Sequence, residues 1–564
     1  MDRRRFLALG AVALAAPRSA VAAPDAVPWE RLAREVGSRL QPVEWPLGAC
    51  AGGDTAACDA LFENARNPFF LGDHPGLAQS FGWTDGWALQ PSARVVVAET
   101  AGDVSAAVRF AADTGVRLVV KGGGHSYHGD SNAAGSLLVW TRRMDAVVLH
   151  DGFVPSGSAA APQPAVSVGA GAMWGEVYRR VSVEGGRYVQ GGGCLTVGVA
   201  GLVLSGGFGS FSPRFGLAAA NLLEAEVVTA DGAVRTVSAA QEPDLFFALK
   251  GGGGGFAVVT RVTLRTHPLP RAFGLVAMEV EAASEGDYRT LVRDFLVHYR
   301  MNLSNPAWGE QAIFRPDNRL RISMLFSDID EDEARAVWEP FFARVRRDGG
   351  LHLGSEPVVV ALPGRSFWDP EVLSAMPGVV LRDTQPGAPP DRIYWAGNAV
   401  EAGKVTHGFG SVWLRSDLLA DPDALAGALV AASRHWPVSL HFNKGLAFSG
   451  DPVRTAALDT AMNPEVTRAF ALAISGAEGP PAYPGVAGHA PDAARGRSEG
   501  RRVAAAIGAL RAATGATGSY SAESDYVLAD WASAYWGENA GRLRAIKRAR
   551  DPRGLFVQHH GPVG

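Results

Sequence analysis

A basic excess is absent from this chain, which removes the simplest reason to expect nucleic-acid binding. The 564 residues carry 53 Lys and Arg against 57 Asp and Glu, a net charge of −4, whereas nucleic-acid-binding domains gather positive charge. Internal repeats and low-complexity tracts are also absent, and no apolar run after the first residues is long enough for a stable membrane span. Hydrophobic residues at 47% and charged residues at 20% indicate a globular protein, and the length predicts two or three domains.

The first 22 residues predict a signal peptide for export. A basic start, an apolar run over residues 6–16 and small residues at Ala20 and Ala22 are typical of a cleaved signal. Residues 3–7 (RRRFL) are similar to the twin-arginine signal, which exports folded proteins. An ordinary secretory leader or a lipid-facing anchor is the alternative. We therefore expect a periplasmic or secreted protein.

Cysteine is scarce, with three residues in the whole chain. Export to an oxidising space favours a disulfide between Cys50 and Cys58, which would close a short glycine-containing loop. Two free thiols are the alternative. Cys194 is then the odd cysteine, and an odd cysteine in an exported protein needs a reason.

A glycine triplet at residues 122–124 follows a predicted strand–helix–strand unit. Residues 93–98 read as a strand, Thr100 and Asp103 as caps of a helix through about residue 114, and residues 116–120 as a second strand. A nucleotide-binding Rossmann unit would require a helix to begin at the glycines. Instead the chain runs into another strand at residues 136–140, so the loop joins strand to strand and the Rossmann interpretation fails.

The loop itself, RLVVKGGGHSYHGDSN at residues 117–132, predicts an anion-binding nest. Successive backbone N–H groups of Gly122, Gly123 and Gly124 are suited to hold an anion, and Ser126 adds a hydroxyl. A metal site, a reactive His125 and a plain turn are the alternatives. His128 is three residues further on but has no evident role.

Two later segments are equally rich in glycine. Residues 191–216 hold nine glycines around Cys194, which favours a backbone threaded against a large flat ligand; a buried cysteine in a tight turn is the alternative. Residues 244–260 (DLFFALKGGGGGFAVVT) predict a helix joined to a strand by five glycines.

These segments resemble the flavoproteins of the vanillyl-alcohol-oxidase fold, in the berberine-bridge-enzyme-like branch, here as a bacterial member. The family's basic residue before Gly-Gly-His-Ser is matched at residues 121–126, its Cys-x-x-Val-Gly loop at 194–209, and its DLFWALRGGGGG block at 244–255. The stretch YWGEN at 535–539 matches the family's C-terminal end. The resemblance is dense over residues 90–265 and 518–560 and poor between them.

The resemblance implies an α+β fold with a two-subdomain PCMH-type FAD-binding domain and a substrate domain whose antiparallel sheet is backed by helices. We expect the FAD-binding domain at residues 30–268, the substrate domain at 269–515, and a C-terminal segment at 516–564 that returns to the FAD-binding domain.

The resemblance also implies FAD as cofactor, bound through two covalent links. His125 matches the histidine that bonds the 8α-methyl carbon of the flavin, and Cys194 matches the cysteine that bonds C6. A neutral imidazole and a thiolate are the right nucleophiles for this chemistry. Val197 matches an oxygen-gate position and favours O2 as electron acceptor. The remaining expected cofactor contacts are Lys121, Gly122, Gly123, Gly124, Ser126, Gly198, Gly201, Gly206 and Gly207.

The catalytic base is where this sequence departs from the family. The family motif Tyr-x-Asn-Tyr supplies a tyrosine base from its last position, whereas here Tyr520 is followed by Ala522 and Glu523. Glu523 is either the base or a polar residue on the pocket rim, with Tyr520 beside it. His441 and Lys444, on a predicted strand (SLHFNKG), are further candidates, with solvated strand charges as the alternative. The pair His559-His560 indicates exposure or packing beside the flavin rather than a metal site.

The sequence therefore predicts an exported FAD-dependent oxidase of alcohol or carbohydrate hydroxyl groups, acting on a small-molecule substrate such as an alcohol, sugar or aromatic natural product and producing H2O2. A flavin dehydrogenase with another acceptor and a non-catalytic flavoprotein that binds a ligand are the alternatives. Aromatic side chains in the middle segment are suited either to stack on a ring or to form core, namely Trp368, Tyr394, Trp395 and Trp413.

Overall fold

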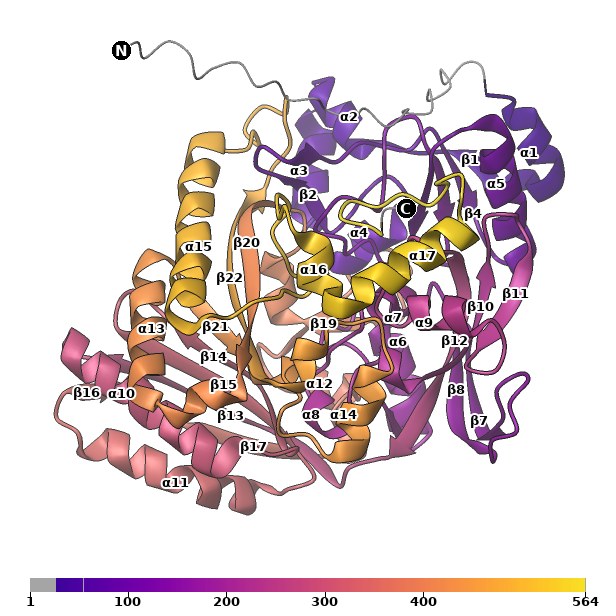
Figure 1. The fold of residues 1–564 in the computed structure, drawn as a ribbon. Helices are drawn as coiled ribbons and strands as arrows, with labels where there is room; N and C mark the ends of the chain where they lie inside the picture. Colours follow the sequence, from indigo (N-terminus) through magenta and orange to yellow (C-terminus); the bar gives the residue numbers. More distant parts are fainter. Residues whose placement is uncertain (1–26, 54, 563–564) are drawn as a thin grey trace, which may run out of the picture.

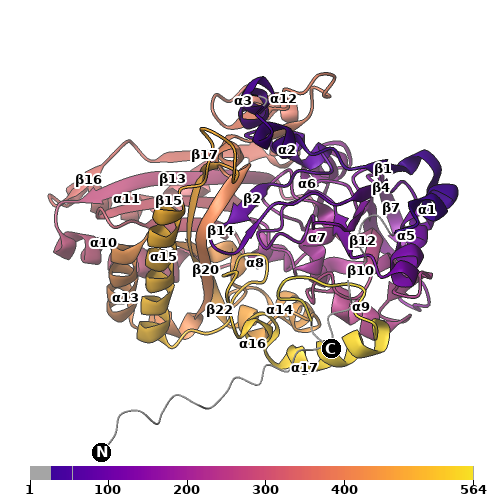
Figure 2. The ribbon, with the colours of Figure 1, turned by 90° about the horizontal axis from the view of Figure 1, so that it is seen from above.

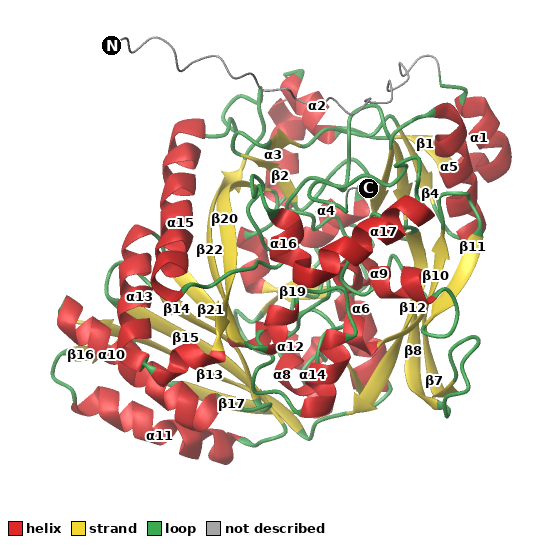
Figure 3. Ribbon diagram, viewed as in Figure 1, coloured by secondary structure: helices red, strands yellow, loops and turns green. Residues whose placement is uncertain are grey.

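Three larger β-sheets, one two-stranded ribbon and their covering helices build the described part of the chain. The computed structural model describes residues 27–53 and 55–562, and the predicted signal peptide lies outside these residues. In Figures 1 and 3 two sheets lie at one end of the molecule and a large third sheet lies at the other, with the last helices between them. The predicted α+β fold is confirmed.

The first sheet carries the glycine triplet. Its strand order is β1-β4-β6-β5, with bounds Leu40–Pro42, Arg94–Val97, Leu137–Trp140 and Leu118–Lys121. Helix α5 (Ala101–Thr114) begins at the predicted cap, where Thr100 and Asp103 form a capping box, and ends at Gly115 in the left-handed conformation. Strands β5 and β6 pair in parallel, so the glycine loop joins strand to strand, as predicted.

The second sheet is antiparallel and completes the FAD-binding part. Its order is β11-β10-β12-β8-β7, with β9 beside β12. The bounds are Val234–Ser238, Leu222–Val228, Val258–Pro268, Gln163–Gly169, Val147–Phe153 and, for β9, Arg187–Val189. Helix α17 (Ala540–Arg550) buries Leu543 and Ile546 in the same core as helix α9 (Pro243–Leu249). The C-terminal segment thus returns to the FAD-binding part (Figure 1).

The third sheet is built mainly from the segment expected to form the substrate domain, and β2 and β3 join it from residues 80–88. Its order is β16-β13-β15-β14-β21-β22-β20-β2-β3, with β17 beside β13. The bounds are Leu351–Leu353, Ala272–Ala282, Arg319–Ser327, Trp308–Phe314, Val438–His441, Ala469–Pro481, Lys404–Arg415, Ser80–Trp83 and Trp87–Ala88, with β17 at Val358–Pro363. All neighbours pair antiparallel except β2 with β20, which pair in parallel.

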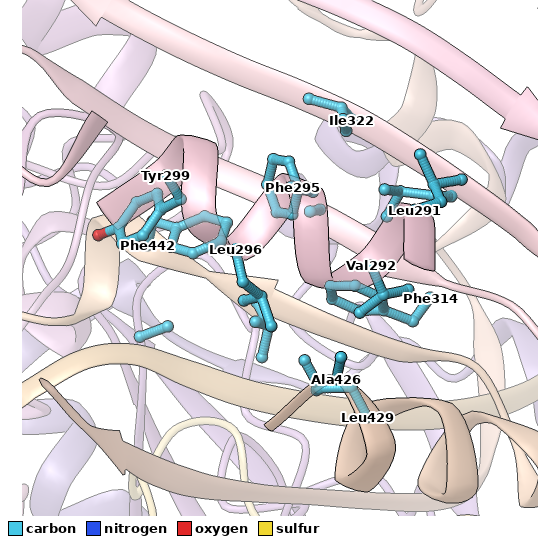
Figure 4. Packing of buried hydrophobic residues seen from close by; sticks show 14 of the residues in the cluster. Leu291, Val292, Phe295, Leu296, Tyr299, Phe314, Ile322, Ala426, Leu429 and Phe442 are labelled. Atoms are coloured by element: carbon cyan, nitrogen blue, oxygen red, sulfur yellow. The ribbon is translucent and has the colours of Figure 1, made fainter. Parts of the chain in front are cut away.

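Four long helices cover one face of the third sheet and bury its apolar side chains (Figures 1 and 2). They are α10 (Glu285–His298), α11 (Glu331–Arg347), α13 (Pro422–His435) and α15 (Ala493–Thr514). Figure 4 shows Phe295 and Leu291 of α10 within this core, with Phe314 of β14 and Leu429 of α13 close by. The opposite face of the sheet is therefore left to meet the FAD-binding part.

Short helices occupy the connections. They are α1 (Trp29–Val36), α2 (Pro46–Ala51), α3 (Thr55–Asn64), α4 (Pro68–Asp73), α6 (Trp174–Tyr178), α7 (Val199–Leu204), α8 (Ser212–Phe215), α12 (Pro370–Ser374), α14 (Asp451–Leu458) and α16 (Trp531–Trp536). Cys50 of α2 and Cys58 of α3 form a disulfide, as predicted. Strands β18 (Val380–Arg382) and β19 (Ile393–Trp395) pair with each other as a separate two-stranded ribbon.

One local prediction is wrong. The stretch SLHFNKG does not continue as a strand to Lys444, because β21 ends at His441 and a 3-10 turn follows at Phe442–Lys444. The turn redirects Lys444, so strand alternation does not place it beside His441. In the part of the chain that the structure describes, no helix has the length and apolar character that a membrane crossing requires.

Candidate active site

Two glycine loops meet beside strand β20 of the third sheet. The first follows β5 at residues 122–128, and the second leads from β9 into α7. A Cβ atom on Gly123 would lie 2.9 Å from both the Gly198 nitrogen and the Thr196 oxygen. Only glycine permits this approach of two backbones, so the triplet is needed where the loops touch.

The first loop presents backbone donors without protein acceptors. The N–H groups of residues 122–126 donate to no acceptor among the residues that the structure describes. Gly124 adopts a φ of 76°, which turns the chain between these amides. Buried backbone donors normally have partners, so a run of free donors fits a bound anion such as a pyrophosphate.

Two polar side chains of this loop are already bound within the protein. The Lys121 ammonium donates to the carbonyls of Leu71, His74 and Leu77 at 3.3, 2.6 and 2.7 Å, and burial lowers its pKa to about 7. The Ser126 hydroxyl lies 3.3 Å from an Asp130 carboxylate oxygen. Through these side chains Lys121 and Ser126 shape the loop.

One hydroxyl connects the two predicted flavin ligands. Thr196 Oγ1 lies 3.3 Å from His125 Nε2 and 3.4 Å from Cys194 Sγ. Burial lowers the pKa of His125 to about 4, so the imidazole is neutral at pH 7. Burial raises the pKa of Cys194, so the thiol must lose its proton before it can act as a nucleophile. The structure thus brings the two residues together although 69 positions separate them.

Charged side chains of the third sheet face these loops. Lys404 Nζ binds Glu478 Oε2 at 2.5 Å and lies 5.4 Å from the centre of the Tyr127 ring. Lys444 forms an ion pair with Glu523. The carboxylates of Glu401, Glu523 and Glu478 raise the pKa of Tyr127 further, beyond the effect of burial. Acidic side chains therefore surround the loop that carries His125.

The C-terminal residues proposed for catalysis reach this cluster. Glu523 donates its N–H to the Tyr520 carbonyl at 2.9 Å, and its carboxylate accepts from Lys444. Tyr520 is buried, its ring lies 5.9 Å from Lys444 Nζ, and its hydroxyl has no partner in the described chain. His441 Nε2 lies 3.1 Å from Ser439 Oγ, and burial and then Lys444 hold its pKa well below the usual range. His441 is therefore a neutral neighbour of the cluster.

The other predicted cofactor contacts differ in their surroundings. Gly198 precedes α7 and contacts Gly123, and the Val197 carbonyl accepts from the Trp174 N–H at 3.1 Å. A Cβ on Gly206 would lie 2.3 Å from Met462 Sδ, and one on Gly207 would lie 2.7 Å from the Ala218 Cβ. Gly206 and Gly207 thus permit close packing within the protein, whereas a Cβ on Gly201 would meet nothing within 4 Å.

Three histidines of the first loop and the C-terminal tail pack against each other. The ring centre of His128 lies 5.3 Å from those of His559 and His560, and burial lowers its pKa to about 4. Within the described residues no group of three potential ligands is arranged to hold a metal ion. The stacked rings hold the C-terminal tail against the glycine loop, and the His559 backbone N–H also donates to the Asp130 carboxylate at 2.8 Å.

Of the four aromatic candidates, one reaches the glycine loops. Trp395 Nε1 donates to the Gly193 carbonyl at 2.8 Å. The other three are core residues: Trp368, Tyr394 and Trp413.

Sequence reasoning missed the middle-segment residues that complete the site. Asn398 Oδ1 lies 3.3 Å from Cys194 Sγ, and Asn398 Nδ2 donates to Glu401 at 3.2 Å. These residues, with Lys404 and Glu478, lie in the segment that resembles the family least. Tyr127 directly follows the matched motif at residues 121–126. It is the only one of these residues that the motif could have indicated.

The residues present fit FAD. Free backbone donors suit a pyrophosphate, and a neutral imidazole and a thiol on one hydroxyl suit the two edges of an isoalloxazine ring. His125 and Cys194 would hold the ring, residues 122–126 the phosphates, and the carboxylates and lysines would face the substrate.

Comparison with known proteins agrees with this geometry. Residues 92–238 match the family model of the FAD binding domain, and residues 519–561 match that of berberine and berberine-like proteins. A fungal FAD-linked oxidoreductase, easE of Arthroderma otae, is 32% identical over 340 residues. That match covers 55% of each chain, so the chain spans about half of this relative. The FAD-linked oxidoreductase malF of Malbranchea aurantiaca is 28% identical, with 95% of this chain and 90% of malF covered.

Solved structures share the whole fold. The VAO-type flavoprotein MtVAO615 of Myceliophthora thermophila superposes with a TM-score of 0.76 at 23% identity, covering 95% of this chain and 94% of the other. Glucooligosaccharide oxidase of Acremonium strictum, which carries a 6-S-cysteinyl, 8α-N1-histidyl FAD, has a TM-score of 0.64 at 20% identity, covering 92% and 99%. The relatives named here are fungal, and the bacterial origin stays a prediction. The chain thus matches the FAD binding domain over residues 92–238 and berberine-like proteins over residues 519–561, and it shares the fold of VAO-type flavoproteins.

Proposed function

We propose that the protein is an FAD-dependent oxidase that converts an alcohol or carbohydrate hydroxyl group into a carbonyl and reduces O2 to H2O2. The observation that carries this proposal is the ion pair between Lys444 and Glu523 beside the loops of His125 and Cys194. It supplies a carboxylate where the family motif has a tyrosine. FAD, when bound, supplies the hydride acceptor.

Glu523 is the base in this proposal. Oxidation of a C–H bond beside a hydroxyl requires the hydroxyl proton to leave, and a carboxylate oxygen of Glu523 is placed to accept it. Lys444 neutralises this carboxylate before proton transfer and orients it, because its ammonium contacts Glu523 from a turn that the third sheet holds in place. Tyr520, buried against Phe208, forms the apolar wall behind the pair.

His125 and Cys194 retain the cofactor in this proposal, each through one covalent bond. Their positions on a single Thr196 hydroxyl support the assignment, as does the doubly linked FAD of a structural neighbour. A covalently held cofactor suits a protein that the twin-arginine-like leader would export folded, since FAD is not resupplied outside the cytoplasm. We extend the proposal to a periplasmic or secreted location on that basis.

The test is a screen of alcohols and sugars for H2O2 formation, with Glu523→Gln as the diagnostic variant and Glu538→Gln, at an exposed position, as the matched control. We expect the Glu523 variant to lose kcat/KM by roughly 100-fold or more, the usual contribution of a general base, and the control to keep it. Equal activity of both variants would remove Glu523 from the mechanism.

Anaerobic stopped-flow mixing of reduced enzyme with O2 distinguishes the alternatives. Fast reoxidation supports the oxidase. Sluggish reoxidation together with fast reduction by substrate indicates a dehydrogenase that uses another acceptor. A protein that binds the screened compounds but turns none of them over would be a non-catalytic flavoprotein.

A further inference from the structure

Thr196 is a buried threonine of the second glycine loop, and the proposed reaction assigns it no step of its own. The residues on either side of it are bound to helix α6. The Gly175 N–H donates to the Leu195 carbonyl at 2.8 Å, and the Trp174 N–H donates to the Val197 carbonyl at 3.1 Å. These hydrogen bonds fix the position from which the Thr196 hydroxyl acts.

The Thr196 hydroxyl contacts one atom of each predicted flavin ligand. Its Oγ1 lies 3.3 Å from His125 Nε2 and 3.4 Å from Cys194 Sγ, and it has no further side-chain partner in the described chain. A hydroxyl group has one proton to donate and two lone pairs that accept. It can therefore accept from one of these atoms while it donates to the other, but it cannot donate to both.

The His125 imidazole has its proton on the side of Thr196. The ring is neutral at pH 7, because burial lowers its pKa to about 4, and a neutral imidazole carries one proton. The Thr196 backbone also hydrogen-bonds this ring, and a backbone carbonyl can only accept. A Cβ on Gly123 would lie 2.9 Å from that carbonyl oxygen and 3.4 Å from His125 Cδ2, which places the carbonyl at the Nε2 edge of the ring. Nε2 is therefore the nitrogen that holds the proton.

The other ring nitrogen is left free to react. Nδ1 of His125 has no partner among the residues that the structure describes. When Nε2 carries the proton, Nδ1 keeps its lone pair, and the tautomer is set by the hydrogen bonds at Nε2. Because the hydroxyl then accepts from Nε2, its own proton is available to the Cys194 sulfur.

Three hydrogen-bond donors surround this sulfur. They are the Thr196 hydroxyl and the backbone N–H groups of Thr196 and Val197, and each favours the thiolate. Burial acts the other way and raises the pKa of the Cys194 thiol, with a smaller effect in the same direction from Glu401. The resting S–H group donates to Asn398 Oδ1 at 3.3 Å. The three donors are therefore placed for the charge that develops on the sulfur when its proton leaves.

We propose that Thr196 is a positioning residue for both covalent links to FAD. Its hydroxyl accepts from His125 Nε2, which leaves Nδ1 free to form one bond, and it donates to the Cys194 sulfur, which stabilises the thiolate that forms the other bond. This role rests on the covalent attachment in the proposed function.

Both attachments balance in the same way. The His125 ring loses its N–H proton, or Cys194 loses its S–H proton, and a C–N or C–S bond replaces one C–H bond of the flavin. The proton and the two electrons of that C–H bond leave together with the proton of the residue, and O2 takes them up as H2O2. Thr196 is not consumed in either attachment, so its removal should change the rate at which the links form.

Three variants of the full chain test this role. Thr196→Val keeps the shape of the side chain and removes the hydroxyl, whereas Thr196→Ser keeps the hydroxyl. Thr266→Val is the matched control, because Thr266 is a buried threonine of β12 whose hydroxyl has no partner in the described chain. The proteins are produced with limiting riboflavin, purified and incubated with FAD in air, and aliquots are precipitated with acid. Mass spectrometry of the flavin-bearing peptides then reports attachment at His125 and at Cys194 separately.

We expect Thr196→Val to form each link about tenfold or more slowly than the parent, the effect of losing a hydrogen bond to a charged group. Its total flavin content before acid treatment should equal that of the parent. Thr196→Ser and Thr266→Val should both form the links at a rate close to that of the parent.

Four results would overturn the role of Thr196. They are an unchanged rate in Thr196→Val, slowing at one of the two residues alone, equal slowing in Thr196→Ser and Thr196→Val, and a loss of total flavin in Thr196→Val that matches its loss of attachment. A parent protein without any covalent flavin would contradict the attachment in the proposed function and this role with it. A parent with covalent flavin and an unaffected Thr196→Val would contradict this role alone.

Discussion

Lys444 and Glu523 form an ion pair across 79 residues of chain, one from the turn after β21 and the other from the C-terminal segment that closes the site. The lysine side chain is 9% exposed and the glutamate side chain 24%. A partly buried pair of this kind is sensitive to the loss of one partner, because the remaining charge is left without compensation.

Replacement of Lys444 by methionine should therefore lower kcat/KM, because Glu523 loses the ammonium that orients its carboxylate. The measurement is kcat/KM with a substrate found in the H2O2 screen. Lys444→Arg, which keeps the charge, should restore kcat/KM at least in part; an unchanged kcat/KM in Lys444→Met would separate the pair from catalysis.

Replacement of Gly123 by alanine should prevent FAD incorporation. The added Cβ would lie 2.9 Å from two backbone atoms of the second loop, and overpacking of this kind costs about 1–3 kcal/mol. The loops would have to separate at the point where the cofactor is held. The measurement is the ratio of flavin to protein absorbance after purification, with Gly508→Ala in helix α15 as control because its Cβ would meet nothing within 4 Å. Equal flavin content in both variants would contradict the role assigned to the loop contact.

The sequence predicted the local elements well where short-range chemistry decides them. Thr100 and Asp103 cap α5 as expected, and Gly115 ends it. The turn at Phe442–Lys444 was not predicted, because the alternation of SLHFNKG continues past the point where the chain leaves the sheet. Strands β2 and β3, from residues 80–88, join the third sheet beside β20; such long-range pairing leaves no local signal.

The residues of the site also fall into two groups, those that sequence motifs predict and those that only long-range contacts reveal. His125 and Cys194 were predicted from motifs, and the structure joins them through Thr196. Thr196 was not predicted because it occupies a variable position of the Cys-x-x-Val-Gly loop, and its significance lies in its contact with His125, a partner 71 residues away. Asn398 and Glu401 lie in a segment without motif resemblance, so only the third sheet and its connections reveal that they face Cys194.

Stability should fall as the pH drops from about 6.5 to 4. Burial holds the pKa of His298 at about 4 in the folded protein, against about 6.5 when unfolded. Between these values the unfolded chain binds the extra proton, so acid favours unfolding, and the contribution is fully present only above the unfolded pKa. His298→Phe should reduce the pH dependence by about one proton, or roughly 1.4 kcal/mol per pH unit.

Urea unfolding curves over this pH range provide the measurement. His352→Gln, at an exposed position, is the control and should retain the original slope. A slope in the His298 variant that equals that of the parent would show that the buried imidazole does not contribute.

Removal of the disulfide should destabilise the helices before β2. Cys50 and Cys58 are 8 residues apart, and closing so short a loop restricts the unfolded chain by about 2–3 kcal/mol. The double variant Cys50→Ser, Cys58→Ser should unfold at lower urea concentration than the parent. Thiol titration of the denatured parent should find one free thiol before flavin attachment, that of Cys194; three would contradict the pairing.

The most direct test of the central claim is acid precipitation of the purified protein, followed by the flavin absorbance of the washed pellet. If His125 and Cys194 each bind the cofactor covalently, the parent pellet is yellow, each single alanine variant retains flavin in its pellet, and the double variant releases all of it. A colourless pellet from the parent protein would contradict covalent attachment, and a yellow pellet from the double variant would contradict its assignment to these two residues.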